Sequence, residues 1–249
     1  MMTIRFRPSL IGTIAVVLLC PLFIRLGFWQ LSRAEEKHKL QAYYTQQSQF
    51  PVIKLETLPD YVFKETDLHW RSVTILGHYL DNFQLLLDNQ THNGRIGYAV
   101  FTPFNIANSQ QILWVNRGWI PIVNYDRSAL PPNLEVDTTS QRIQGTLSPL
   151  PPALFQLGEE SIETLRPQIL RLQTFDLTKI KKYTGIQALP YMLRLDGGDN
   201  KHFVQEWTLP GTGEEKHYGY AFQWFSFAIA VIIIYLIMGF KRYSSLKKP

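Results

Sequence analysis

The residues best suited to chemistry lie at the start of an apolar segment near the C-terminal end of the chain. His217 directly precedes residues 218–240, which carry no formally charged side chain. On a helix, residues at offsets of four, seven and eleven share one face with the first residue. Such a face offers an imidazole ligand, small residues and an aromatic plane, which together suit an iron-containing macrocycle. The residues at these offsets are Ala221, Trp224 and Ala228.

A second set of candidates lies near the end of the first apolar segment. Arg25, Trp29 and Arg33 follow one another at intervals of four, so on a helix they share a face. Their guanidinium groups would suit the propionates of a haem, and Gly27 would let a second helix approach closely. The candidate cofactor-binding residues are therefore His217, Trp29, Arg25, Arg33, Tyr220 and Trp224, with His217 as the metal ligand.

The same residues also have ordinary structural explanations. A histidine at a helix start among aromatic residues is commonly an anchor at the membrane–water interface. Arg25 and Arg33 can extend their side chains to that interface or contact lipid phosphate. From the residues alone, the ligand and the anchor interpretations both stay open.

Two apolar segments must position these residues. Crossing ~30 Å of hydrocarbon takes about 20 helical residues. Residues 218–240 are long enough, begin with aromatic residues and end before two cations, so we expect a transmembrane helix. Residues 10–31 have the right length for another, with Pro21 as a tolerated kink. The alternative for this first segment is a cleaved signal peptide with a loose small-x-small site at residues 32–34.

The charge distribution predicts the orientation of these segments. The chain has 25 Lys and Arg against 20 Asp and Glu, and six of the cations lie in residues 1–9 and 241–249. Without those six, 19 basic residues remain against 20 acidic residues. This balance is unlike the cluster of basic residues on a nucleic-acid-binding domain. By the positive-inside rule we expect both tails in the cytoplasm and residues 32–217 in the periplasm. The absence of a transit peptide favours a bacterial inner (plasma) membrane over an organelle.

Residues 32–217 are expected to form one α+β domain, mainly of antiparallel sheet, flanked by the two transmembrane helices. The beginning of this region, residues 32–47, should continue the first helix. Asn93-Gly94 predicts a hairpin turn, and residues 175–183 indicate a short helix with Asp176 as N-cap and Gly185 after its end. Strands are expected at residues 70–80, 83–88, 96–104, 111–117, 141–147, 191–195 and 203–207.

Several chemistries find no support in the sequence. The single cysteine, Cys20, lies in the first apolar segment, so the domain has no disulfide and no thiolate metal site. We find no nucleophile elbow, zinc-protease motif or phosphate loop, and none of the six histidines lies three to five residues from another. Residues 116–119 indicate a strand that ends in a tight turn, with Arg117 in a buried or edge ion pair. Because the sequence contains none of these reactive motifs, we expect no enzymatic activity.

Four blocks of sequence carry a resemblance to a known family. They are LGFWQLSRAEEK, LLLDNQTHNGRIGYAVFTPF, LWVNRGWIP and KHYGYAFQWFSFA, in this order. They resemble the Surfeit-locus-one (Surf-one) family of cytochrome c oxidase assembly proteins. The resemblance implies an inner-membrane protein that holds or delivers haem a for the catalytic subunit of a haem–copper oxidase. The proposed haem ligand of the family's H-x-x-Y-A block falls on His217, and the tryptophan of its G-x-W-Q block falls on Trp29.

The resemblance also implies partners. These are oxidase subunit one, haem a synthase or other assembly factors, and the lipid bilayer, with transiently bound haem a and no nucleic acid. The question of whether the protein forms a homo-oligomer stays open. The alternative function is a haem-free scaffold that stabilises an oxidase assembly intermediate. A membrane-tethered hydrolase is a third class, and it would require a polar cleft with a nucleophile and a base.

Overall fold

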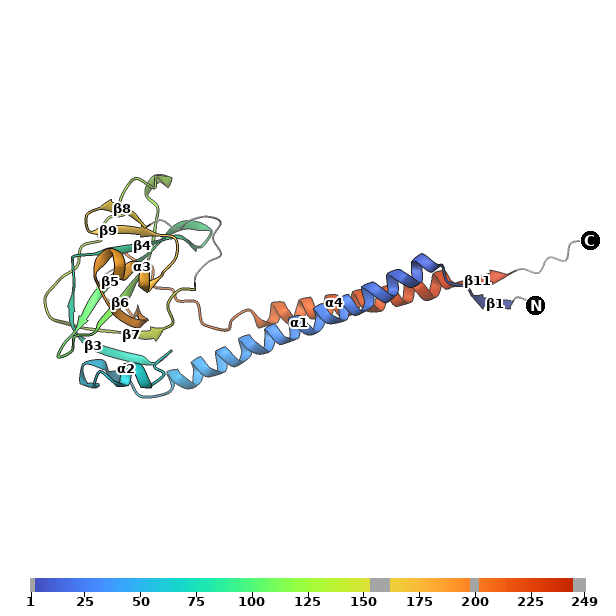
Figure 1. Ribbon diagram of the computed structural model, residues 1–249, viewed down its shortest axis with the longest axis horizontal. Helices are drawn as coiled ribbons and strands as arrows, with labels where there is room; N and C mark the ends of the chain where they lie inside the picture. Colours follow the sequence, from blue (N-terminus) through green and yellow to red (C-terminus); the bar gives the residue numbers. More distant parts are fainter. Residues whose placement is uncertain (1–2, 153–161, 198–201, 244–249) are drawn as a thin grey trace, which may run out of the picture. The chain divides into compact units, whose positions relative to one another are not determined.

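The structure is a computed structural model that describes residues 3–152, 162–197 and 202–243 (Figure 1). The chain divides into two compact units. The helical unit comprises Met1–Tyr43 and Thr208–Pro249, and the globular unit comprises Tyr44–Trp207. The candidate residues taken from the sequence all belong to the helical unit.

Two long helices form the helical unit. They are α1 (Leu10–Ser48) and α4 (Glu214–Gly239), and both are long and apolar enough to cross a membrane. They run antiparallel, since a short ladder between β1 (Thr3–Phe6) and β11 (Phe240–Tyr243) joins the start of one to the end of the other. The helix α1 continues through residues 32–47, as the sequence predicts.

Small residues line the seam between the two helices. Cys20, Gly27 and Ala34 lie seven residues apart and are buried on α1, and Ala221 and Ala228 are buried on α4. A seven-residue spacing keeps one stripe of an α-helix against its partner. The expected close approach at Gly27 is confirmed, because a β-carbon there would lie 2.7 Å from the ring of Phe225. Ala34, the last residue of the loose small-x-small site, is fully buried within the continuous helix α1.

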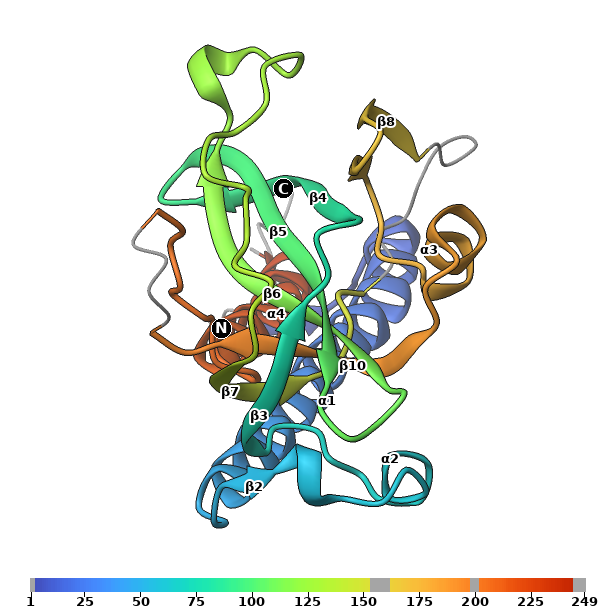
Figure 2. The ribbon, with the colours of Figure 1, turned by 90° about the vertical axis from the view of Figure 1, so that its left-hand side faces the viewer.

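The globular unit contains a closed ring of five strands (Figure 2). The ring closes because β3 pairs with β7 on one side and with β5 on the other. At the closing contact, Gly77 lies opposite Ile106, and a β-carbon at Gly77 would clash with the carbonyl oxygen of Asn105. In ring order the strands are β3 (Ser72–Tyr79), β7 (Gln141–Ser148), β10 (Ala188–Leu195), β6 (Ile112–Pro121) and β5 (Arg95–Ile106).

The remaining elements extend this ring. The strand β4 (Gln84–His92) pairs with β5 through the hairpin turn at Asn93 and Gly94, whose φ angles are 47° and 74°, as the sequence predicts. The helix α3 (Leu177–Thr184) begins where Asp176 accepts hydrogen bonds from two backbone N–H groups, and Gly185 follows it in the left-handed region. The others are β2 (Ile53–Lys54), η1 (Leu55–Thr57), α2 (Val62–Glu65), η2 (Val123–Tyr125), β8 (Glu163–Arg166) and β9 (Ile169–Leu172).

Alternating side chains of these strands build the hydrophobic core. One cluster fills the inside of the ring, with Val73, Phe104 and Leu193 among its members. A second lies between β4, β5, β9 and α3, where Phe101 and Phe175 have ring centroids 4.6 Å apart. The predicted class is confirmed: a mainly antiparallel α+β domain with two flanking apolar helices.

Two local predictions are wrong. Residues 203–207 form no strand, because only Val204 pairs, in an isolated bridge with Trp119. Residues 116–119 do not end a strand either, since β6 continues to Pro121. Gly118, with φ of 125°, lies at a bulge that faces β5, where a side chain would meet the backbone of Val204. The elements β2, α2, β8 and β9 are too short, at two to four residues, to show a clear periodicity in the sequence.

Candidate functional site

His217 lies in the first turn of α4 and faces α1. Its Nδ1 atom is 2.7 Å from the Oε1 atom of Gln30, whose residue is only 9% exposed. An amide oxygen can only accept, so the imidazole donates through Nδ1–H. Within the described residues, the other ring nitrogen, Nε2, has no hydrogen-bond partner. In the neutral form of the ring, this hydrogen bond leaves a free lone pair on Nε2, and histidine binds a metal through such a nitrogen.

Polar contacts at the start of α4 fix its position along α1. The Nζ of Lys37 donates to the carbonyl oxygen of Thr212 at 3.0 Å, and Nδ1 of His38 lies 3.2 Å from a carboxylate oxygen of Glu214. At Gly211 the chain lies so close to α1 that a β-carbon would be 2.8 Å from the backbone nitrogen of Gln41. Together these contacts place His217 opposite Gln30.

Aromatic rings pack against one another along the seam, in the turns of α4 that follow His217. Phe23 of α1 stacks on Trp224 with ring centroids 5.7 Å apart and an interplanar angle of 30°. Phe28 meets Phe225 edge-on at 5.4 Å. Trp224 therefore belongs to the packed seam between the helices.

The helix α1 covers the face of α4 on which the sequence spacing places a flat ligand, the face shared by His217, Ala221 and Ala228. Ala221 is 2% exposed and Ala228 is 4% exposed, and the thiol of Cys20 points to the carbonyl oxygen of Ala228 at 3.6 Å. This face is filled by a helix and leaves no open wall. Any flat ligand of His217 must therefore lie at the edge of the seam, outside these two alanines.

The other candidates lie on exposed surfaces of the helices. Arg25 and Arg33 are exposed, and Trp29 is 49% exposed. The guanidinium carbon of Arg33 lies 5.8 Å from the centre of the Trp29 ring, and Arg33 also pairs with Glu36 at 2.7 Å. Tyr220 is exposed on α4. The structure thus brings His217 and Trp224 to the seam and leaves Arg25, Trp29, Arg33 and Tyr220 on outer surfaces.

Gln30 is the residue that the sequence reasoning missed. It follows Trp29 directly and lies three residues from Gly27 and four from Ala34, which places it on the seam side of α1. Its polar side chain could have pointed to a role, because a polar side chain in an apolar helix is costly unless it forms a hydrogen bond with a partner. That signal does not name the partner, which lies 187 residues away in the sequence.

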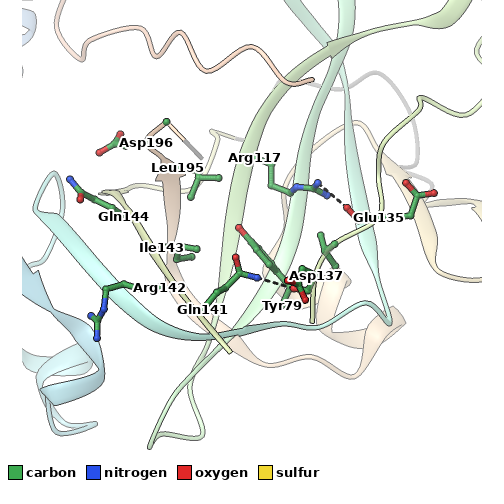
Figure 3. Close-up of a pocket in the computed structure, with 12 residues that line it drawn as sticks. Tyr79, Arg117, Glu135, Asp137, Gln141, Arg142, Ile143, Gln144, Leu195 and Asp196 are labelled. Atoms are coloured by element: carbon green, nitrogen blue, oxygen red, sulfur yellow. Dashed lines mark hydrogen bonds between the residues drawn. The ribbon is translucent and has the colours of Figure 1, made fainter. Parts of the chain in front are cut away.

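The globular unit holds a polar cavity of about 580 Å³ (Figure 3). At its wall, Arg117 is 2% exposed and donates to the carbonyl oxygens of Leu134, at 2.7 Å, and Glu135, at 3.1 Å. In the part of the chain that the structure describes, this guanidinium donates to carbonyl oxygens and forms no ion pair with a carboxylate, so the predicted ion pair is wrong. Burial lowers the pKa of Arg117 to about 10 and raises the pKa of Tyr79 to about 12. Arg117 therefore acts as a structural cation that ties residues 134–135 to β6.

Comparison with known proteins matches nearly the whole chain. The model of the SURF1 family matches residues 17–229. A SURF1-like protein of Rickettsia felis is 28% identical over 235 residues, which cover 90% of this chain and 95% of that protein. One of Rickettsia conorii is 27% identical, covering 87% of this chain and 86% of the relative. The cytochrome oxidase assembly protein SHY1 of Saccharomyces cerevisiae is 33% identical over 97 residues, 38% of this chain and 24% of the yeast protein.

Proposed function

The chain belongs to the SURF1 family, and on that basis we propose that it is an assembly factor for a haem–copper cytochrome c oxidase. The yeast relative, which bears the name of cytochrome oxidase assembly, supports the role. The SURF1-like relatives extend the similarity over both apolar helices and the globular unit. The proposed role is non-enzymatic, and its partners are oxidase subunits, first of all subunit one, and other assembly factors such as haem a synthase.

We propose further that the cargo is haem a, held by His217. The observation that carries this proposal is the hydrogen bond from Nδ1–H to Gln30, which leaves the Nε2 lone pair free. An imidazole nitrogen is a common axial ligand of haem iron. On the exposed surface of α1, Arg25, Trp29 and Arg33 offer cations for propionates and an aromatic face for the macrocycle.

The covered seam suggests why such binding would be transient. Because α1 already covers Ala221 and Ala228, a haem on Nε2 would lie at the edge of the helix pair and would be only partly enclosed. A partly enclosed cargo is open to a second protein surface. That arrangement suits delivery to an oxidase subunit better than permanent storage.

The test is the absorption spectrum of the protein purified in detergent from a cell that makes haem a. We expect wild-type protein to carry low-spin haem a and His217→Ala to lose it. His202→Ala, which changes an exposed histidine of the globular unit, is the matched control and should keep the spectrum. Unchanged haem content in His217→Ala would rule out the ligand assignment.

The second candidate function is a haem-free scaffold that stabilises an oxidase assembly intermediate. The filled face at Ala221 and Ala228 favours it, since a helix pair without an open wall needs no cofactor to pack. In this case the purified protein would bring oxidase subunit one with it and carry no haem. His217→Ala would then leave the association intact.

A further inference from the structure

The contact between Gln30 and His217 differs from the contact that links α1 and α4 near their other ends. Near the opposite end of α4, the hydroxyl groups of Thr13 and Tyr235 lie 3.0 Å apart, which also links the two helices. That contact joins two hydroxyl groups and involves no metal-binding atom. The Gln30 contact instead engages one of the two nitrogens of an imidazole, so it decides which nitrogen carries the proton.

Packing holds both partners of this contact in place. Gln30 is buried between two small residues of the seam, Gly27 and Ala34. The contact of Lys37 with Thr212 holds the chain just before α4, and that of His38 with Glu214 holds the first residue of α4. Because both backbones are fixed, the Gln30 amide can set both the tautomer and the orientation of the ring.

Metal-binding histidines are usually oriented in this way. The ring nitrogen that does not bind the metal donates its hydrogen to an oxygen, which fixes the tautomer and raises the basicity of the ligating nitrogen. We propose that Gln30 is a positioning residue that holds His217 as the Nδ1–H tautomer and so presents Nε2 as the haem ligand. This inference rests on the proposed function for the identity of the ligand, but the tautomer can be tested without any haem.

The first arm of the test uses cofactor-free protein in lipid nanodiscs, with ¹⁵N-labelled histidine and the imidazole in its neutral form. Long-range ¹H–¹⁵N spectra report which ring nitrogen carries the proton. We expect the Nδ1–H tautomer in the wild type and a mixture of both tautomers in Gln30→Met, which keeps the length of the side chain but removes the acceptor. Gln30→Glu restores an acceptor and should restore the Nδ1–H tautomer.

Tyr235→Phe is the matched control, since it removes an interhelical hydrogen bond, that with Thr13, without touching His217. It should keep the wild-type tautomer. If Gln30 only pinned the helices together, Tyr235→Phe and Gln30→Met would leave the ring of His217 equally unaffected. Circular dichroism of both variants confirms that the helices are intact.

The second arm titrates the same variants with haem a. Loss of the group that orients a metal ligand typically weakens metal binding about 10- to 100-fold, and we expect this loss in Gln30→Met but not in Gln30→Glu or Tyr235→Phe. A wild-type protein with the Nε2–H tautomer, an unchanged tautomer in Gln30→Met, or equal haem affinity in all variants would overturn the role of Gln30. Wild-type protein that binds no haem a would instead overturn the proposed cargo, while the tautomer arm still decides what Gln30 does to the ring.

Discussion

Gly27 of α1 lies directly against the ring of Phe225 of α4, with no room for a side chain between them. The Phe225 ring cannot easily withdraw, because it also packs edge-on against Phe28. Close approach of this kind is typical of membrane helices that pack through small residues. The seam that carries Gln30 and His217 therefore depends on the absence of a β-carbon at position 27.

We expect Gly27→Leu to separate the helices and to destabilise the helical unit. Overpacking a tight contact typically costs about 1–3 kcal/mol, which thermal unfolding in detergent can measure. Gly219→Ala is the control, since nothing lies within 4 Å of a β-carbon there. It should be neutral or slightly stabilising, because alanine favours a helix by up to about 1 kcal/mol over glycine. Equal unfolding temperatures for the wild type and Gly27→Leu would contradict the tight seam.

The closing contact of the five-stranded ring gives a second prediction. Gly77→Ala introduces a β-carbon that clashes with the carbonyl oxygen of Asn105, so β3 and β5 must move apart. We expect a loss of at least about 1–3 kcal/mol in the free energy of unfolding of the globular unit. Thr74→Ala, on the same strand but partly exposed, should cost less. Urea denaturation followed by tryptophan fluorescence compares the two variants.

Glu56 provides a prediction about pH. Burial raises the pKa of this carboxyl, but hydrogen bonds from Arg142 and from the backbone of Leu76 outweigh burial, and the pKa lies below its usual value of 4.5. A group whose pKa is lowered in the folded state stabilises the fold above about pH 4.5, and this stabilisation is lost as the pH falls through the folded-state pKa.

Glu56→Gln should therefore destabilise the globular unit at pH 7, by about 1.5–3 kcal/mol, which is typical of hydrogen bonds to a charged group. The difference between the wild type and the variant should shrink as the pH is lowered from 5 to 3. Denaturant titrations at several pH values measure it. A difference that stays constant over this range would show that the charge of Glu56 does not stabilise the fold.

The exposed aromatic and cationic residues of α1 should contribute to the binding of haem a and not to the stability of the helix pair. We expect Trp29→Ala and Arg33→Ala to lower haem a content several-fold while the unfolding temperature stays close to that of the wild type, because both side chains are exposed. Trp224→Ala should instead destabilise the helical unit, since it loses its stacking with Phe23. If the two exposed variants kept full haem content, these residues would have no part in the site.

Orientation in the membrane can be tested directly. We expect the globular unit in the periplasm and both tails in the cytoplasm. In a Cys20→Ser background, a cysteine at Tyr183, which is 55% exposed, should react with a membrane-impermeant maleimide in spheroplasts. A green fluorescent protein fused to the C-terminus should be fluorescent, as it is in the cytoplasm. The reverse pattern would reject the predicted orientation.

Features that depend on neighbouring residues can be predicted from the sequence alone. The two apolar segments and the seven-residue spacing of small residues follow from composition and helical period. The cap of α3 at Asp176 and the turn at Asn93-Gly94 follow from local backbone preferences. His217 also stands out locally, because it is a single imidazole at the start of an apolar helix.

Contacts between residues far apart in the chain become visible in the folded structure. Nothing in the local pattern around Gly77 shows that β3 pairs with β5 as well as β7, and nothing around Gln30 names His217 as its partner. The covering of Ala221 and Ala228 by α1 likewise depends on how closely two helices pack. The physical reason is the same in each case. A periodic pattern specifies which face of an element is buried, whereas steric fit and hydrogen bonding between two elements select what that face is buried against.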